Sequence, residues 1–235
     1  SVLEIVQKSP EEAQSTRYGF GRYMVVRPYR VPRSLDGEQG QALFAAAAGV
    51  GIEEFVDDNP KDLSAYGLVR PWAELVARDK ESTLRLRFGA RRMDGKRFFR
   101  VSDRPNVYAV SEASLTFLDT PAFSLVEKFV FIPNIDDVDR IDITAGGATH
   151  VLAISRSPQP PAADGEEPQV TESFTVDGKQ VTDEAFRSFY QRLIGLLVDG
   201  ELRNPPPTVL AAAPEVRARF RLNKGGPAEV VVSYL

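Results

Sequence analysis

The residues best placed to bind a charged partner lie between Thr83 and Arg104, where eight basic residues stand against two acidic ones. The eight are Arg85, Arg87, Arg91, Arg92, Lys96, Arg97, Arg100 and Arg104. The aromatic residues interleaved with them are Phe88, Phe98, Phe99 and Tyr108, and such a mixture resembles a nucleic-acid platform. Strand alternation, however, needs some of these rings in a core, and acidic residues elsewhere in the chain could neutralise the arginines. We expect a solvated or intramolecularly paired surface, with Arg85 to Arg100 as candidate partner-binding residues and no nucleic-acid binding.

Two large rings, Tyr66 and Trp72, flank a turn marked by glycine and proline in "YGLVRPW". Rings at such a position commonly seal a connection against a sheet. Together with Asp79 they are also the residue types that carbohydrate sites favour. We therefore expect a packing role, with ligand-groove aromatics as the alternative.

His150 is the single histidine of the chain and lies in "ATHVLAI", which has the character of a strand. A Ser-His-Asp arrangement would need it as the base, yet no GxSxG elbow is present. We expect a strand residue at a sheet edge, and no catalytic residues.

Four aspartates gather in "NIDDVDRID", namely Asp136, Asp137, Asp139 and Asp142. A calcium loop of the EF-hand type needs oxygen ligands at alternate positions, which Val138 and Arg140 interrupt. Solvated strand ends and turn caps fit better. The glycine clusters at 19–21, 145–147 and 224–226 lack the phosphate-binding patterns and indicate hairpin turns. We expect neither a metal nor a cofactor.

Composition narrows the class of protein further. A chain of 235 residues can form one large domain or two small ones, and its net charge of −4 gives no overall attraction to nucleic acid or anionic lipid. Cysteine is absent, which excludes disulfides and thiolate sites. No segment reaches the roughly 18 apolar residues of a membrane span.

Apolar periodicity predicts a mixture of hairpins and helices. Strands are expected at 22–26, in a hairpin over 72–88, in two segments joined by a turn at Asp94–Gly95, in a pair around 138–156, and in a closing hairpin over 216–234. Helices are expected over about 36–56, over 111–131 with a cap at Ser111 and a break near Pro121, and after an N-cap at Thr182.

The order of strand, helix, proline-bounded connection and hairpin occurs twice, which indicates an internal duplication. The prediction is an α+β protein of two related units, 19–135 and 136–235, each an antiparallel sheet packed by one or two helices. A complete second copy would continue beyond Leu235 with more strands.

Several segments resemble a bacterial domain-of-unknown-function family, catalogued as number four-three-four-zero. They are "DLSAYGLVRPWAELVARD", "TLRLRFG", "RFFRVSDRPNVYAVSEASLTFL" and "VEKFVFIPNIDDVDRIDI". The resemblance covers about 20–145 well and the second copy loosely. It implies an envelope protein with an N-terminal membrane anchor, similar in gene setting to auxiliary components of ABC-type and gliding-motility transport systems. It transfers no catalytic residues.

Two functions follow as expectations. The first is a non-enzymatic, extracytoplasmic module that binds proteins of a membrane transport complex, whose membrane anchor would precede the present sequence. The second is a small-molecule or glycan-binding module with a groove between the two repeats. An unrecognised hydrolase would need carboxylates that meet in a deep cleft.

Overall fold

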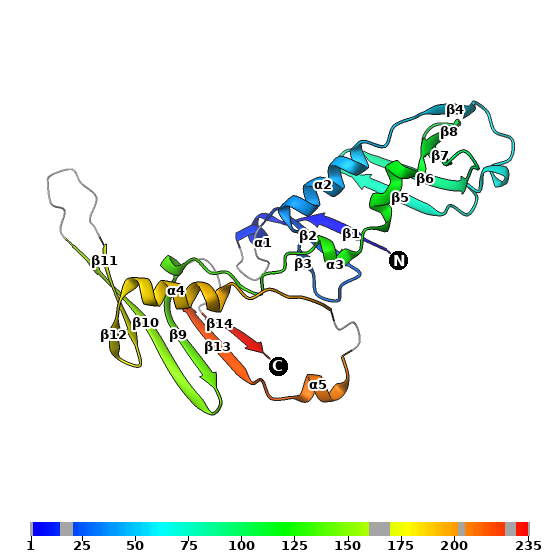
Figure 1. Ribbon diagram of the computed structural model, residues 1–235. Coiled ribbons are helices and arrows are strands. Elements are labelled where there is room, and N and C mark those ends of the chain that lie inside the picture. Colours follow the sequence, from blue (N-terminus) through cyan, green and yellow to red (C-terminus); the bar gives the residue numbers. More distant parts are fainter. Residues whose placement is uncertain (1, 15–20, 160–169, 202–204, 224–228, 235) are drawn as a thin grey trace, which may run out of the picture. The chain divides into compact units, whose positions relative to one another are not determined.

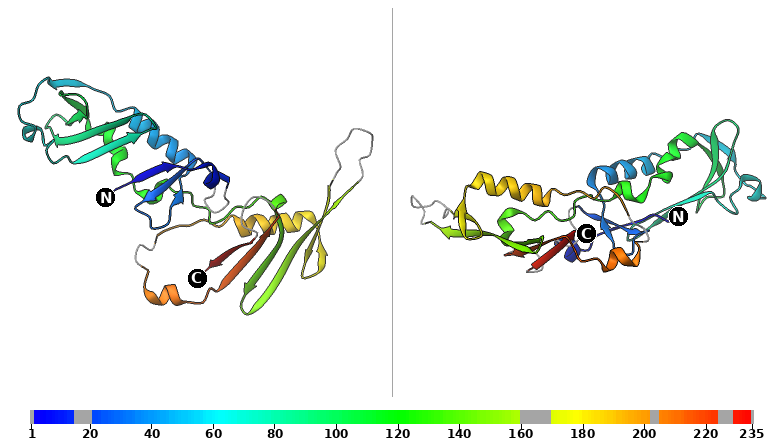
Figure 2. Two further views of the ribbon diagram at one scale, coloured as in Figure 1. Left: turned by 180° about the vertical axis from the view of Figure 1, so that it is seen from behind. Right: turned by 60° about the horizontal axis from the view of Figure 1, so that its bottom comes forward.

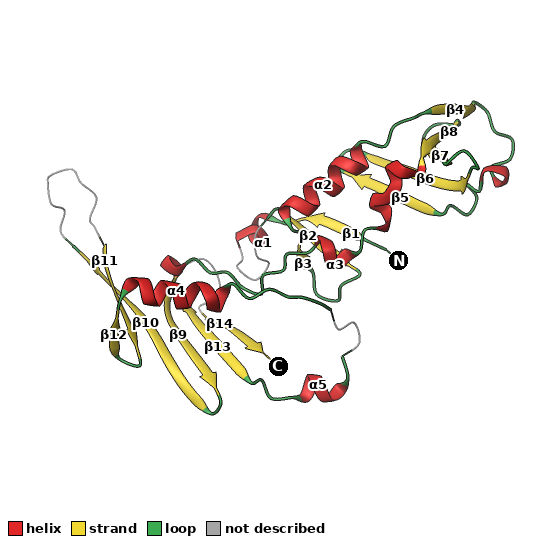
Figure 3. Ribbon diagram, viewed as in Figure 1, coloured by secondary structure: helices red, strands yellow, loops and turns green. Residues whose placement is uncertain are grey.

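The computed structural model describes residues 2–14, 21–159, 170–201, 205–223 and 229–234 (Figure 1). The chain forms two compact units. Unit 1 combines Ser1–Asp36 with Val126–Leu235, and unit 2 is the segment Gly37–Leu125 between them. The sequence predicts a division at 135/136 from the repeated order of elements. In the structure, the N-terminal segment belongs to the same unit as the C-terminal half. Both units combine antiparallel sheets with helices, which confirms the α+β class (Figure 3).

Unit 2 contains a five-stranded antiparallel sheet in the order β4-β8-β7-β6-β5. Its strands are β4 (Glu54–Asp57), β5 (Ala73–Arg78), β6 (Thr83–Arg91), β7 (Lys96–Val101) and β8 (Val107–Ser111). Its helices are α2 (Gly37–Ala48) and α3 (Ala122–Leu125), with 3-10 helices over Ser64–Tyr66 and Glu112–Asp119. The predicted hairpins over 72–88 and at Asp94–Gly95 are both present.

Alternation along β6 builds the core of unit 2. Leu86 and Phe88 are buried, and the arginines between and beside them face outward. Phe88 stacks on Phe99 of β7 with ring centroids 6.0 Å apart, and Tyr108 of β8 packs beside Phe99 at 5.4 Å. Leu84 has the same alternation but is 47% exposed, and it lies next to the β5–β6 turn, where Ala77 is its partner.

Two predicted helices differ from the structure. The helix expected over about 36–56 ends at Ala48, since the glycines that follow do not favour helix, and 54–57 joins the sheet as β4. The helix expected over 111–131 is replaced by a 3-10 helix and the four-residue α3, because Pro121 cannot donate to an α-helical ladder. The Ser111 side chain makes no capping hydrogen bond. None of the helices in the described ranges has the length and apolar character that a bilayer crossing requires.

Unit 1 begins with a small three-stranded sheet, β1 (Glu4–Gln7), β2 (Tyr23–Arg27) and β3 (Arg33–Ser34), and a short helix α1 (Pro10–Gln14). The strand predicted at 22–26 is β2. Lys8 is buried beside this sheet, and its Nζ donates to Ser34 Oγ at 3.1 Å. Burial lowers the pKa of Lys8.

The larger sheet of unit 1 has six antiparallel strands in the order β12-β11-β10-β9-β13-β14. They are β9 (Val138–Ala145), β10 (Ala148–Pro158), β11 (Val170–Val176), β12 (Lys179–Val181), β13 (Val216–Leu222) and β14 (Glu229–Tyr234). The described residues of this part of unit 1 also form helices α4 (Asp183–Ile194) and α5 (Pro207–Ala211) and a 3-10 helix over Ile135–Asp137. The predicted strand pair around 138–156 and the closing hairpin are confirmed.

Helix α4 lies along one face of this sheet (Figures 1 and 2). It begins as the sequence predicts, because Thr182 Oγ1 accepts a hydrogen bond from the Ala185 amide at 3.3 Å. Phe186 and Tyr190 are buried against the sheet, where Phe186 packs on Phe174 with centroids 4.7 Å apart. The Tyr190 hydroxyl donates to the Pro133 carbonyl at 2.8 Å.

Candidate binding site

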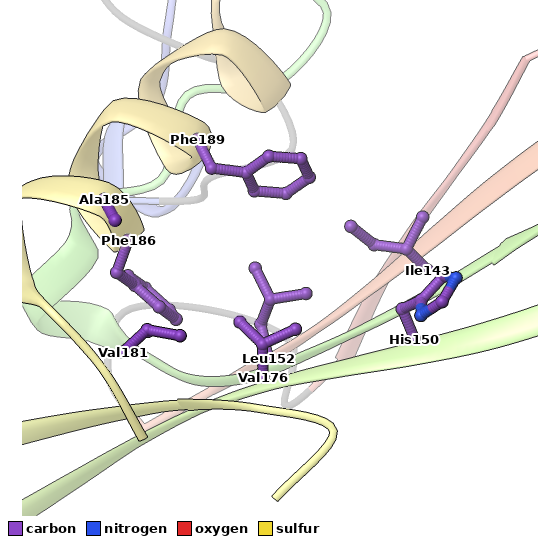
Figure 4. Close-up of a pocket in the computed structure, with 8 residues that line it drawn as sticks. All are labelled: Ile143, His150, Leu152, Val176, Val181, Ala185, Phe186 and Phe189. Carbon is purple, nitrogen blue, oxygen red and sulfur yellow. The ribbon is translucent and has the colours of Figure 1, made fainter. Parts of the chain in front are cut away.

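An apolar pocket lies between α4 and the six-stranded sheet, with a volume of about 310 Å³ (Figure 4). Its lining comes from five neighbouring elements: Ile143 of β9, His150 and Leu152 of β10, Val176 of β11, Val181 of β12, and Ala185, Phe186 and Phe189 of α4. Apart from His150, all of these lining side chains are apolar. Pockets for small molecules commonly measure about 300–1,000 Å³ and are mostly apolar, so this one is at the small end of the range.

The sheet register builds the floor of the pocket. Leu152 lies directly opposite Ile141 on one side and Val176 on the other, and His150 lies opposite Ile143. Residues opposite one another in a ladder share a face, so these side chains form two adjacent rows under the helix. The floor is therefore fixed by backbone pairing.

The wall is formed by two phenylalanines with different degrees of burial. Phe186 is 2% exposed and belongs to the core, whereas Phe189, one turn later, is 47% exposed. Figure 4 shows the Phe189 ring projecting from α4 over the space above Ile143 and Leu152. An aromatic ring that is half exposed beside an apolar cavity offers contact area to a ligand without first having to be uncovered.

His150 lies at the rim, and its ring is held by Asp177 from the β11–β12 turn. His150 Nδ1 and Asp177 Oδ2 are 2.8 Å apart, and the other carboxylate oxygen accepts from the Val151 amide at 2.8 Å. These two hydrogen bonds, that of His150 first, lower the pKa of Asp177. An ionised Asp177 assigns the proton to Nδ1 and leaves Nε2 for another group.

This position differs from the sequence prediction in one respect. His150 is exposed, but β10 lies between β9 and β11, so the residue is not on an edge strand. It is the third residue of β10 and lies next to the β9–β10 turn. A histidine oriented by a carboxylate is the arrangement of a general base, which also needs a nucleophile within hydrogen-bond reach. The residues that line the pocket in the described part of the chain supply none.

The candidate partner-binding arginines of β6 meet a carboxylate on the neighbouring strand. Arg85 Nη1 lies 2.8 Å and Arg87 Nε 2.9 Å from the two oxygens of Glu74. Glu74 is directly opposite Arg87 in the β5–β6 ladder, so the register makes this contact. Glu74 lies outside the segment from Thr83 to Arg104, so a count of the charges within that segment leaves it out.

The basic residues around the β6–β7 turn are paired in the same way. Arg92 contacts Glu54 at 3.0 Å and Asp94 at 2.9 Å, and Lys96 contacts Glu54 at 3.4 Å. The hydrogen bond from Arg92 is the largest cause of the lowered pKa of Glu54. Arg91 contacts Glu112 at 2.6 Å.

Arg97 is the most buried of these cations. It donates to the Gly89 carbonyl at 2.8 Å and to Glu112 at 2.7 Å, and its guanidinium lies 4.1 Å from the centroid of the Trp72 ring. Arg100 Nε, by contrast, donates to a backbone carbonyl, that of Arg104, at 3.0 Å. These basic residues are thus paired with carboxylates and carbonyl groups of the same chain, which is one of the arrangements expected from the sequence. Partner binding by this strip stays a prediction.

The two candidate ligand-groove aromatics both have packing partners in unit 2. The Tyr66 hydroxyl donates to Asp57 at 2.8 Å, which raises the pKa of Tyr66, and its ring meets Phe98 edge-on at 5.1 Å. Asp79 caps the β5–β6 turn, at the opposite end of β5 from Trp72, where it accepts from the amides of residues 81 and 82. The six residues of β5 lie between Trp72 and Asp79, and at about 3.3 Å per step of the strand the two are roughly 23 Å apart. A role for Tyr66 and Trp72 in ligand binding stays a prediction.

The aspartates of 136–142 also have partners within the protein. Asp139 accepts from Arg156 at 2.8 Å and from Asn223 at 2.7 Å, and Asp142 accepts from Arg140 at 2.7 Å. Within the described ranges, no group of three or more histidine and carboxylate side chains is arranged to hold a metal ion.

The pocket itself was not among the sites predicted from the sequence. Ala185, Phe186 and Phe189 continue one apolar stripe in the sequence, and such a stripe is typical of a helix that packs on a core. A stripe indicates which face of a helix is apolar, and the extent of the opposing sheet then decides which of its residues are covered. The sequence signal that could have indicated the pocket was the length of the apolar stripe. The stripe continues through Leu196 and Leu197, beyond the end of the helix.

Comparison with known proteins gives one result. Residues 25–200 match the family model described as Domain of unknown function (DUF4340). No curated protein and no solved structure matches the chain significantly. Since the matched segment spans well over half of the sequence, the chain belongs to the DUF4340 family.

Proposed function

We propose that this protein is a non-enzymatic binding module and that the pocket between α4 and the six-stranded sheet holds an apolar group of what it binds. The observation that carries the proposal is the lining, which is apolar except for His150 and whose floor is formed by strands paired in a fixed register. Burying apolar surface contributes about 25 cal/mol per Å², and the pocket offers such surface without rearrangement of the core. The half-exposed Phe189 is the residue that a bound group would cover.

Binding of the neutral dye Nile red, followed by its fluorescence, tests this function. The wild-type protein is expected to bind one dye molecule, and Phe189→Asp is expected to lose binding because it places a charge in the wall. Met93→Asp is the matched control, since Met93 is fully exposed in the β6–β7 turn of unit 2. Equal binding by all three proteins, or no binding at all, would contradict the proposal.

The setting that we propose is the cell envelope, where the module would act as an accessory component of a membrane transport assembly. This part rests on the family resemblance. The native protein, immunoprecipitated from its own host after mild cross-linking, should recover subunits of a membrane transport complex. Recovery of cytosolic proteins alone would refute it.

The second candidate function is small-molecule binding, and the size of the pocket favours it. The glycan form of this function, through Tyr66 and Trp72, has less support, because the Trp72 ring already carries the Arg97 guanidinium at 4.1 Å. A thermal-shift screen that covers both sugars and apolar compounds separates the two forms.

A further inference from the structure

A lysine stands beside the floor of the pocket. Lys179 of β12 lies directly opposite Val176 of β11, and Val176 lines the pocket. Because opposite residues share a face, the Lys179 side chain leaves the sheet on the side of the pocket. Val181, two residues further along β12, lines the pocket on the same face. Lys179 therefore places an ammonium group beside the β12 border of the pocket, where it also interacts electrostatically with Asp177.

An arginine in the last turn of α4 lies on the flank of the helix that lines the pocket. Arg192 follows Phe189 by three residues and Ala185 by seven, which places the three on one flank of α4. Arg187 lies on the opposite flank of α4, where it contacts Asp183 in the first turn of the helix and Glu172 on β11. Arg192 and Lys179 are both exposed.

His150 completes the rim at the β9–β10 end. Its Nδ1 faces Asp177, whose two oxygens are engaged by the imidazole and by the Val151 amide. The free nitrogen, Nε2, can hydrogen-bond to a ligand. The surroundings of the pocket therefore include a lysine on β12, an arginine on α4 and the His150 imidazole, and the carboxylate that faces the imidazole is already hydrogen-bonded.

We propose that the pocket binds a single-chain anionic amphiphile, such as a fatty-acid carboxylate. The alkyl chain lies between Phe189 and the floor rows, and the anionic head lies at the rim beside Lys179, Arg192 and His150. This inference rests on the proposed binding function of the pocket and names its ligand class. The volume of about 310 Å³ fits one alkyl chain, and the cations supply the complementary charge.

Displacement of Nile red by three twelve-carbon compounds tests the head group. Dodecanoate is expected to displace the dye at about fivefold lower concentration than dodecanol, the size of effect that one or two exposed ion pairs produce. Dodecyltrimethylammonium is expected to be the weakest. Equal displacement by all three would overturn the anionic head while leaving the apolar pocket intact. Absence of dye binding to the wild type would instead refute the proposed function.

A chain-length series tests the tail. Affinity is expected to rise about fourfold per added methylene from octanoate upward and then to level off when the pocket is full. A continued rise without a plateau would show micelle-like association and would overturn the proposal.

Variants place the ligand in the structure. Lys179→Gln with Arg192→Gln is expected to weaken dodecanoate about fivefold and to leave dodecanol unchanged. The matched control, Lys80→Gln with Arg70→Gln, removes two exposed cations of unit 2 and should change neither. Ala185→Trp fills the pocket and should abolish both; Phe189→Asp is the second blocking variant if the tryptophan disturbs folding. Equal loss with the control pair would overturn the site.

The source of the amphiphile is decided by vesicle flotation. Vesicles of phosphatidylcholine with phosphatidylglycerol present the same chemistry within a membrane, and dodecanoate presents it free in solution. Binding of dodecanoate without flotation assigns the pocket to a free ligand, and flotation that Ala185→Trp abolishes assigns it to a lipid chain. Flotation that persists in Ala185→Trp, with no dodecanoate binding, would overturn the proposal.

Discussion

Phe186 and Phe189 lie three residues apart on α4, and truncating each to alanine separates the structural role of the helix from its binding role. Phe186 is 2% exposed and packs on Phe174, so Phe186→Ala removes a fully buried ring. Such truncations cost about 3–5 kcal/mol, because the lost burial is joined by the cavity left behind. Phe189 is 47% exposed and borders space that is already empty.

The expected cost of Phe189→Ala is accordingly small. About half of the ring is buried, which is worth about 1 kcal/mol of the 1.5–3 kcal/mol for a fully buried phenylalanine. Alanine recovers part of this through its higher helix propensity, about 0.5 kcal/mol. The free energy of unfolding should therefore fall by less than about 1 kcal/mol, while Nile red binding weakens strongly.

Urea unfolding followed by circular dichroism measures both variants, with the slope of free energy against urea as the check that the transition is unchanged. A loss for Phe189→Ala as large as that for Phe186→Ala would refute the reasoning, since it would make Phe189 a core residue. Unchanged dye binding by Phe189→Ala at full stability would refute the assignment of the pocket wall.

Three further predictions concern local structure. Thr182→Ala should cost about 1 kcal/mol in urea unfolding through loss of the N-cap, and Thr182→Ser should restore most of it; equal stability of all three proteins would contradict the cap. Gly89→Ala should lower the stability of unit 2 by about 1–3 kcal/mol, because a Cβ there would lie 2.2 Å from the Tyr66 carbonyl oxygen and displace backbone; an unchanged thermal midpoint would count against that contact. The folded-state pKa of Asp177 is lowered, chiefly by His150, so its stabilising contribution is present above the unfolded pKa of about 3.9 and is lost as the pH falls through the folded pKa. Asp177→Asn, which tolerates the φ of 50° at that turn, should therefore flatten stability against pH below about 4, and an unaltered acid limb in urea titrations would contradict the hydrogen bond.

Features encoded within a few residues could be predicted from the sequence. The helix that starts at Thr182 needs only its cap and its stripe, and the hairpin at Asp94–Gly95 needs only a turn that accepts a positive φ. The closing hairpin expected over 216–234 is likewise local, since Ala218 and Phe220 alternate with arginines and are buried in β13. Each of these signals is local, and the tertiary packing agrees with it.

Features that depend on distant partners could not be predicted. Leu125 ends the short α3, and Val126 pairs with Leu35 in an extended bridge, which a continuous helix over 111–131 would have prevented. The pairing of Arg85 and Arg87 with Glu74 required the β5–β6 register. The pocket required knowledge of where the sheet extends beyond α4, which no local pattern contains.

The central claim is that the space between α4 and the six-stranded sheet is the binding site of the protein. Methyl NMR measures this most directly, with dodecanoate titrated into protein labelled at isoleucine, leucine and valine. We expect saturable shifts of the Ile143, Leu152 and Val176 methyl resonances, while those of Leu86 and Val107 in the core of unit 2 stay unchanged. Shifts confined to unit 2, or no saturable shift of the three pocket residues, would contradict it.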